Sequence, residues 1–239
     1  MPKFFTSPYC ITDDSLKIVG EDVSHIARVL RMSPGDSIIV CDGEGNDYDA
    51  EITEITKDCV LAKIISRYTC LAEPSVKVTF FQALPKQGKM EYIIQKCTEL
   101  GVSKIVPVYT KRCIVKPSDK TERWSKVAES AAKQCGRGVV PEVCPTISLD
   151  EALAQMSTYD CALMPYECEE QTRLKDVISG KSFKTVSIFI GPEGGFDPSE
   201  VQKALSCNIK TVTLGKRILR TETAGSAVLP IIMYENDEI

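Results

Sequence analysis

Short apolar runs separated by turn residues fill the first third of the chain. Residues 37–41 and 48–55 flank a segment rich in aspartate and glycine, residues 42–47, and residues 60–65 form another apolar run. Short runs bounded by turn residues are typical of strands, and the first two runs suit a hairpin. This pattern predicts a compact, barrel-like β module.

A helical pattern interrupts these strands at residues 25–31. Ile26, Val29 and Leu30 fall on one face of the predicted helix, while Arg28 and Arg31 lie elsewhere. We therefore expect one short helix within the β module.

The pattern changes after residues 70–74, where strand-like and helix-like runs begin to alternate. Strands are expected at 76–82, 104–109, 161–164 and 186–190, and helices at 89–100 and 122–135. Trp124 falls on the apolar side of the second helix, so we expect it in the core. Repeated alternation predicts a mainly parallel sheet covered by helices. We expect an α/β protein with two domains, residues 1–72 and 73–239.

Composition narrows the class of protein. No run reaches the roughly 18 apolar residues of a membrane helix, and the N-terminus lacks the apolar core of a signal peptide. The 11 cysteines include no Cys-x-x-Cys pair, and His25 is the one histidine. A Cys/His metal site is therefore not expected. We expect buried thiols in a reducing compartment instead. We expect a soluble cytoplasmic protein without a metal.

Charge is distributed unevenly along the chain, although the net charge is −4. Residues 77–137 carry 13 basic and 5 acidic side chains, and residues 201–221 carry 5 basic and none acidic. A local basic surface can bind phosphates on an acidic protein, although solvated helix faces would give the same count. The pattern favours an anionic partner.

Two polar loops follow predicted strands near the C-terminus, at residues 191–196 and 214–224. The first holds Gly194 and Gly195 before Asp197-Pro198-Ser199-Glu200, which reads as a capped helix start. Ligands of open α/β sheets bind at the carboxyl ends of strands. A tight turn without a ligand is the alternative for the first loop. The Gly-Lys-Ser/Thr sequence of nucleotide hydrolases is absent.

The second loop combines cations with one carboxylate. Lys216, Arg217 and Arg220 precede Glu222, and Thr221 or Thr223 could cap the next helix. Fixed cations beside a carboxylate suit an anionic substrate or one that loses a proton, and simple helix capping is the equal alternative. A serine hydrolase is not indicated, because Ser226 lacks a nucleophile elbow and the histidine lies in the other domain.

Four segments in order carry a family resemblance: residues 89–102 (KMEYIIQKCTELGV), 133–137 (KQCGR), 190–196 (IGPEGGF) and 214–224 (LGKRILRTETA). They resemble the bacterial 16S ribosomal RNA uridine N3-methyltransferases of the SPOUT superfamily. Phe4-Phe5 and His25-x-x-x-Val29-Leu30-Arg31 match as well, so the likeness spans almost the whole chain. Lys3 departs from the usual arginine and Cys135 from the common serine.

The resemblance implies a PUA-like β-barrel for RNA and an α/β SPOUT domain with a trefoil knot over about 160–234. It implies S-adenosylmethionine as the cofactor, a homodimer, and 16S ribosomal RNA of the small ribosomal subunit as the partner. The expected reaction is methylation of N3 of one uridine near the RNA 3′ end.

The resemblance also assigns residues. For this reaction, the charge pattern of the second loop suggests that Arg220 and Arg217 stabilise the uracil anion, and that Glu222 accepts a proton or orients an arginine. The cofactor would be bound by Leu163, Met164, Pro165, Ile190, Gly191, Pro192, Gly194, Gly195, Leu214, Gly215, Ile218, Leu219 and Thr223. RNA would be contacted by Lys3, His25, Arg28, Arg31, Arg112 and Arg137.

Three other functions stay open at this point. A non-catalytic RNA-binding or assembly factor would bind RNA without S-adenosylmethionine. A related methyltransferase could modify another base, or a ribose in tRNA. An enzyme acting on nucleotide phosphates is the most distant reading.

Overall fold

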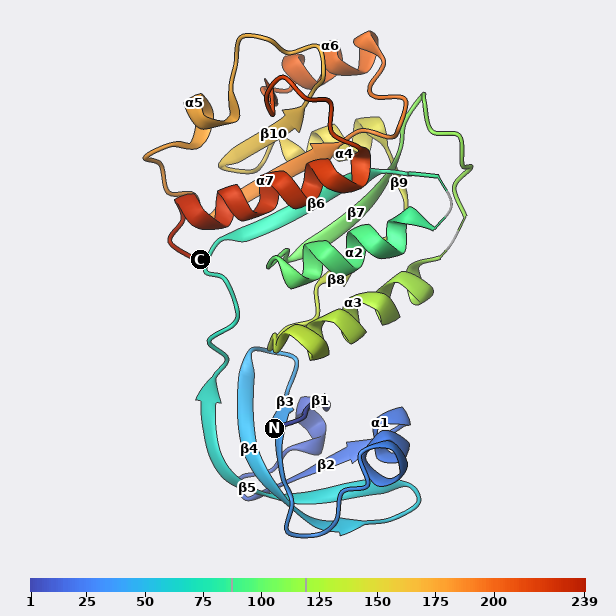
Figure 1. Cartoon of the computed structure of the whole chain (residues 1–239), viewed down its shortest axis with the longest axis vertical. Helices are drawn as coiled ribbons and strands as arrows, with labels where there is room; N and C mark the ends of the chain where they lie inside the picture. Colours follow the sequence, from blue (N-terminus) through green and yellow to red (C-terminus); the bar gives the residue numbers. More distant parts are fainter. Residues whose placement is uncertain (87, 119) are drawn as a thin grey trace. The chain divides into compact units, whose positions relative to one another are not determined.

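The computed structural model describes residues 1–86, 88–118 and 120–239 (Figure 1). By their contacts these residues form two compact units. The first comprises Met1–Glu73 and Ala132–Val140, and the second Pro74–Ala131 and Pro141–Ile239. Residues 132–140, which the sequence places with the C-terminal domain, thus belong to the first unit.

The first unit is built on a five-stranded sheet in the order β1-β3-β4-β5-β2. Its strands are β1 (Lys3–Phe5), β2 (Ser15–Val19), β3 (Ser37–Cys41), β4 (Asn46–Ile55) and β5 (Cys59–Thr69). Neighbours are antiparallel except β1 and β3. A short 3-10 turn, η1 (Pro8–Cys10), follows β1. Two register shifts between β4 and β5 bend the sheet.

Alternating side chains give this sheet a buried face. Leu16 and Ile18 of β2 are buried while their neighbours in the strand are exposed, as the period of two requires. They join a continuous apolar cluster with Phe4, Ile38 and other strand residues. The three strands predicted in this region are confirmed, and β1 and β2 are additional.

The predicted helix at 25–31 is present in altered form. α1 (Glu21–Ser24) continues into a π-helical turn, η2 (His25–Val29), in which the Leu30 amide donates to the His25 carbonyl. Ile26 is buried, but Val29 and Leu30 are exposed. The prediction that all three share the apolar face is wrong, because hydrogen bonds from residue i+5 to residue i widen the turn and rotate later side chains outward.

The second unit holds a seven-stranded sheet in the order β12-β10-β11-β6-β7-β8, with β9 also pairing with β7. The strands are β6 (Lys77–Ala83), β7 (Lys104–Tyr109), β8 (Glu142–Val143), β9 (Ile147–Ser148), β10 (Cys161–Pro165), β11 (Thr185–Ile190) and β12 (Lys210–Val212). Every pairing within it is parallel. The predicted parallel α/β sheet is confirmed.

Helices cover both faces of this sheet. They are α2 (Lys89–Glu99), α3 (Thr121–Cys135), α4 (Leu149–Met156), α5 (Leu174–Ile178), α6 (Pro198–Ser206) and α7 (Thr221–Glu235). Figure 1 shows α2 and α7 in front of the strands and α4 behind them. Trp124 is buried on α3, as predicted.

α7 lies very close to the sheet at Gly225. A Cβ atom at this position would collide with the Phe80 ring of β6. The small-residue stretch 224–227 therefore lets the helix approach, as its composition indicates. This approach fixes the start of α7 over the carboxyl ends of the neighbouring strands.

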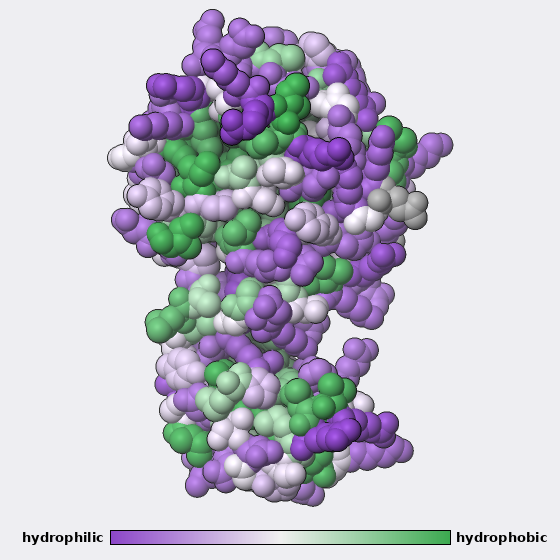
Figure 2. All heavy atoms as spheres, viewed as in Figure 1, coloured by the Kyte–Doolittle hydropathy of each residue, from purple (hydrophilic) through white to green (hydrophobic). Residues whose placement is uncertain are grey.

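The surface mixes polar and apolar side chains. Figure 2 shows apolar atoms in small groups among polar ones on the visible face, in keeping with a mean hydropathy of −0.07. Within the described ranges, no helix has the length and apolar character needed to cross a bilayer.

Candidate functional site

Four neighbouring parallel strands, β12, β10, β11 and β6, end at one edge of the second sheet. Parallel strands bring their carboxyl ends together, so the loops that follow them meet at this edge. Both segments that the sequence singles out, 191–196 and 214–224, begin at this edge, and the second runs into the first turn of α7. Their side chains are therefore the candidate site.

The loop after β11 is shaped by a turn and a helix cap. The Gly195 amide donates to the Pro192 carbonyl at 2.9 Å, and Gly195 has a φ of +65° that favours glycine. Asp197 is the N-cap of α6 and Glu200 completes the capping box, as the sequence predicts. Arg112 Nη1 donates to the Gly194 carbonyl at 2.9 Å and steadies the loop from outside.

Buried hydrogen bonds tie this loop to the start of α7. Thr221 Oγ1 donates to the Gly191 carbonyl at 2.7 Å and accepts from Gln82 Nε2 at 2.9 Å. Gln82 is fully buried in β6. The α7 N-cap is Arg220 and makes no side-chain capping bond, so the prediction that Thr221 or Thr223 caps the helix is wrong. The Thr221 hydroxyl is engaged in this tertiary chain instead.

A second link between the loops is ionic. Lys89 Nζ lies 3.0 Å from Glu193 Oε1 and 2.9 Å from Glu222 Oε2. The Lys86 amide also donates to both Glu193 oxygens, at 3.1 and 3.2 Å. One lysine at the start of α2 thus joins a carboxylate from each loop.

These contacts set the ionisation of the bridge. Burial favours the neutral form of Glu222, but backbone hydrogen bonding and the Lys89 ammonium outweigh it, so the pKa of Glu222 is lowered. The Arg220 charge acts in the same direction. The pKa of Glu193 is lowered by the same balance, and hydrogen bonds to Glu222 and Glu193 raise the pKa of Lys89. All three groups are charged at neutral pH.

The loop before α7 presents its charged side chains to solvent. Arg217 and Arg220 are exposed, and Ile218 between them is 85% exposed. Gly215 has a φ of +104°, which lets the chain turn after β12. Two guanidinium groups thus stand at the sheet edge that carries Glu222.

The residues predicted to bind the cofactor divide into two kinds. Leu163, Met164, Ile190 and Pro192 are buried, so at this edge they offer backbone groups and apolar walls. The others lie in the loops themselves: Gly191, Gly194, Gly195, Leu214, Gly215, Ile218 and Leu219. Pro165 is half-buried and Thr223 is exposed. The structure places all of them in or beside the strand-end loops or the first turn of α7.

Such a lining suits a ligand with an adenine ring and a compact zwitterionic tail. Glycine loops expose backbone amides and carbonyls, and buried aliphatic side chains supply apolar contact. At Gly191 a side chain would press against the Phe196 ring, so glycine keeps the backbone there open. These residues fit S-adenosylmethionine.

The residues predicted to bind RNA also divide. His25, Arg28 and Arg31 are exposed at and just beyond η2, and Arg112 is exposed beside the glycine loop. Lys3 Nζ is buried against Asp47 at 2.7 Å and the Gly136 carbonyl at 2.9 Å. Arg137, with 4% of its side chain exposed, pairs with Glu73 at 2.8 Å. In this structure Lys3 and Arg137 hold the first unit together through these contacts.

Three site residues were missed by sequence reasoning: Gln82, Lys89 and, in its actual role, Thr221. Gln82 left a signal, because it is an amide within the apolar strand Val-Thr-Phe-Phe-Gln-Ala. Lys89 left none, since its partners lie 104 and 133 positions away.

No group of three or more His, Cys, Asp or Glu side chains in residues 1–86, 88–118 and 120–239 is placed to hold a metal ion. The polar groups that meet at the sheet edge are carboxylates, cations and backbone groups. This set can stabilise an anion and hold a polar ligand.

Comparisons with known proteins agree with this geometry. A family model described as an RNA methyltransferase domain matches residues 72–233, and one described as an RNA methyltransferase PUA domain matches residues 18–65. The ribosomal RNA small subunit methyltransferase E of Bacillus subtilis is 35% identical over 235 residues, covering 93% of this chain and 91% of its own.

Solved structures give the same result. The ribosomal RNA small subunit methyltransferase E of Neisseria gonorrhoeae, bound to S-adenosyl methionine, has a TM-score of 0.89 and 33% identity, over 98% of this chain and 97% of its own. A methyltransferase of Legionella pneumophila with bound S-adenosylmethionine has a TM-score of 0.86 and 28% identity, over 97% and 96% of the two chains.

Proposed function

The chain belongs to the ribosomal RNA small subunit methyltransferase E family, and we propose that it methylates N3 of one uridine near the 3′ end of 16S ribosomal RNA. The methyl donor is S-adenosylmethionine, whose sulfonium supplies an activated methyl group. The observation that carries the proposal is the Lys89 bridge, which joins Glu193 and Glu222 beside the exposed Arg217 and Arg220.

The chemistry requires the loss of one proton and the placement of one anion. Uridine N3 carries a proton. Once that proton passes to solvent water, the negative charge left on the ring spreads over N3 and the two carbonyl oxygens, and N3 becomes nucleophilic. Arg220, with Arg217 beside it, stabilises this charge at O2 or O4. N3 then bonds to the methyl carbon as the carbon–sulfur bond breaks, and the sulfur keeps the electron pair.

Glu222 acts in this scheme by orientation. Its pKa is lowered and it is paired with Lys89, so it is a weak base. An ionised Glu222 beside Arg220 instead fixes the guanidinium and balances its charge. The uridine must leave its base pair for N3 to reach the methyl group.

The surroundings of the site are proposed as follows. Exposed His25, Arg28, Arg31 and Arg112 contact the RNA, whereas Lys3 and Arg137 are left out because both are buried in ion pairs. The protein works in the cytoplasm as a homodimer, with a knotted chain over about 160–234. Sedimentation at micromolar protein tests the dimer.

The test of function is methyl transfer. The protein is incubated with labelled S-adenosylmethionine and small ribosomal subunits from a strain without this gene, and the RNA is analysed as nucleosides. The expected product is 3-methyluridine at one 16S position. Label in another nucleoside, or binding of RNA without S-adenosylmethionine, would replace the proposal by another RNA target or by an assembly factor. Arg220→Ala should lose at least about 100-fold in kcat, as expected when one charge-stabilising donor is removed.

A further inference from the structure

A separate cavity of about 190 Å³ lies beside this site in the second unit. Its walls come from the end of β6 and the loop after it, the start of α2, the segment before α3, and the first turn of α3. Its volume is below the roughly 300 Å³ of ordinary small-molecule sites. It therefore suits a single phosphate or base better than a whole cofactor.

The floor of the cavity holds an unused hydrogen-bond donor. Trp124 lines it with only 4% of the residue exposed, and its indole Nε1 has no hydrogen-bond partner among the described residues. A buried N–H without a partner is costly and is usually satisfied. The Nε1 atom itself has almost no exposed surface, so a ligand acceptor in the cavity would satisfy it once the indole turns toward the cavity.

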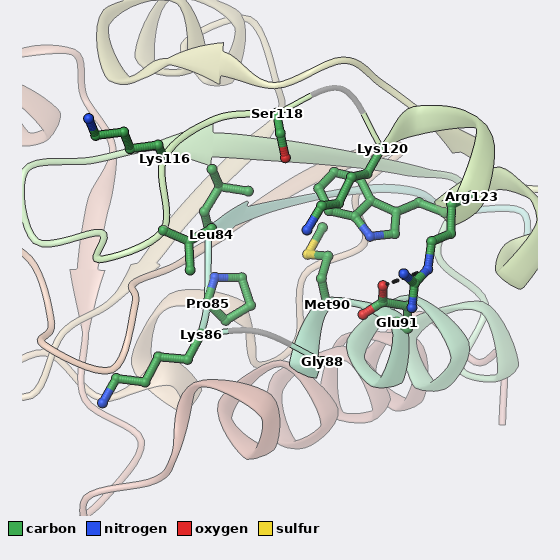
Figure 3. Close-up of a pocket in the computed structure, with 12 residues that line it drawn as sticks. Leu84, Pro85, Lys86, Gly88, Met90, Glu91, Lys116, Ser118, Lys120 and Arg123 are labelled. Atoms are coloured by element: carbon green, nitrogen blue, oxygen red, sulfur yellow. Dashed lines mark ion pairs between the residues drawn. The ribbon is translucent and has the colours of Figure 1, made fainter.

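The rim of the cavity is cationic. Among the described residues that line it are Lys86, Lys116, Lys120 and Arg123, together with the carboxylate of Glu91, which is paired with Arg123 at 3.1 Å. Figure 3 shows the Lys120 ammonium and the Ser118 hydroxyl pointing into the hollow, while Lys86 and Lys116 extend away from it.

Helix ends add to this charge. The N-termini of α2 and α3 both border the cavity, with Gly88 as the N-cap of α2, and helix N-termini favour anions. The unpartnered indole, the rim cations and the two helix ends all select the same ligand chemistry, an anion with hydrogen-bond acceptors.

The cavity is also joined to the proposed methyl-transfer site. Lys86 is one of the residues that line the cavity, and its amide donates to Glu193. Lys89, one residue after the cavity-lining Gly88, bridges Glu193 to Glu222. A group held in the cavity is thus a near neighbour of a base held beside Glu222.

We propose that this cavity binds one phosphate-bearing nucleotide of the substrate RNA close to the methylated base. Trp124 Nε1, Ser118 and Lys120 bind phosphate or carbonyl oxygens inside the cavity, and Lys86 and Lys116 follow the backbone outside it. The proposal rests on the proposed function and adds a second, fixed point of RNA contact. It holds a flanking nucleotide while the target base is turned into the site.

Trp124 makes the test direct, because it is the single tryptophan of the chain. Its emission is followed while the full-length protein is titrated with a single-stranded RNA of the 16S 3′-end sequence, with uridine 5′-monophosphate, or with inorganic phosphate. RNA affinity is measured in parallel by anisotropy of a fluorescein label. The RNA should change the emission at its binding midpoint, at concentrations where the two small anions have no effect.

Lys120→Gln tests the cation, with Lys126→Gln as the matched control. Lys126 lies on α3, which begins one residue after Lys120; its side chain is 68% exposed and is paired with Glu122 outside the cavity. Lys120→Gln should weaken RNA binding about 5- to 10-fold and lower the salt slope by about 0.7, whereas the control should stay near wild type. Trp124→Phe removes the indole N–H but keeps an aromatic ring, and it should weaken RNA binding.

Several outcomes would overturn the proposal. They are unchanged emission at saturating RNA, equal effects of Lys120→Gln and Lys126→Gln, or an emission response to phosphate or uridine 5′-monophosphate that RNA cannot displace. Failure of methyl transfer is a different result. If subunits gain no label while RNA still quenches or shifts Trp124, the proposed reaction is wrong and the cavity assignment stands.

Discussion

The ammonium of Lys89 lies 2.9 Å from the carboxylate of Glu222 and 3.0 Å from that of Glu193. These two carboxylates belong to different loops, so the lysine holds the two loops in a fixed relation. The side chain of Lys89 is 27% exposed, that of Glu193 is 22% exposed and that of Glu222 is 19% exposed. The bridge is thus partly screened by water, so it contributes little to the stability of the fold. Its main effect is to position the two loops.

Lys89→Met should therefore reduce kcat by about 10- to 100-fold and change the Kd for S-adenosylmethionine by less than about threefold. The reason is that loosened loops misplace Arg220 and Glu222, and small errors in position are costly to rate. Single-turnover methylation and equilibrium dialysis measure the two quantities. Lys96→Met on the same helix, whose lysine pairs with Glu99, is the control. Equal kcat values for both variants would remove Lys89 from the mechanism.

The pH profile gives a second check on the bridge. The pKa of Glu222 is lowered from 4.5, so wild-type activity should show no acid limb from this group above about pH 5. Without the Lys89 charge the burial effect is opposed less, so the pKa of Glu222 should rise and an acid limb should move to higher pH. Profiles of kcat/KM from pH 5 to 9 for wild type and Lys89→Met test this. Identical profiles would contradict the assigned role of the bridge.

Arg137 should act on stability rather than on RNA binding. Its pair with Glu73 is buried, at 4% and 13% side-chain exposure, so Arg137→Met should cost about 3–5 kcal/mol by leaving a buried carboxylate without its cation. Urea unfolding measures the loss. RNA affinity of the folded variant should match wild type, and a large fall in affinity with unchanged stability would restore Arg137 as an RNA contact.

The same pair predicts how stability varies with pH. Burial pushes the pKa of Glu73 up, but Arg137 and the amides of Val139 and Gly138 outweigh this, so the net pKa is lowered. Its contribution is then complete above the unfolded value of about 4.3 and is lost as pH falls through the folded value. In Arg137→Met this part of the acid dependence should shrink, as urea midpoints between about pH 3 and 6 would reveal.

Gly225→Ala should destabilise the protein, although alanine is the better helix former. Propensity would favour alanine by up to about 1 kcal/mol, whereas contact with the Phe80 ring should cost about 1–3 kcal/mol. Thermal unfolding gives the sign of the difference. Gly225→Ala combined with Phe80→Leu should recover part of the loss, and a more stable single variant would show that α7 can move away from β6.

Local signals in the sequence predicted the fold well. The parallel α/β sheet, the PUA-like module and the helix start at Asp197 are confirmed, because alternation, turn residues and capping act over a few neighbouring positions. The family was visible for the same reason, in short motifs that stay contiguous. The π-helical turn was not visible, and it carried Val29 and Leu30 to the surface.

Charges were harder to interpret than patterns. Lys3 and Arg137 have the residue types of phosphate ligands, yet each is buried against a carboxylate 44 or 64 positions away. Lys89 shows the reverse case, a lysine within a helix whose importance depends on two distant glutamates. A single sequence records which charges exist, and only the folded chain decides which of them neutralise one another.

The Lys89 bridge can form in full only late in translation. Glu222 is made 133 residues after Lys89, and β10, β11 and β12 all emerge in between. A growing polypeptide that ends before Glu222 has the β6 edge and one arm of the bridge but no α7 to close it. Under the proposed role of the bridge, competence for methyl transfer therefore comes as a single late event in synthesis, and chains that end before Glu222 lack it.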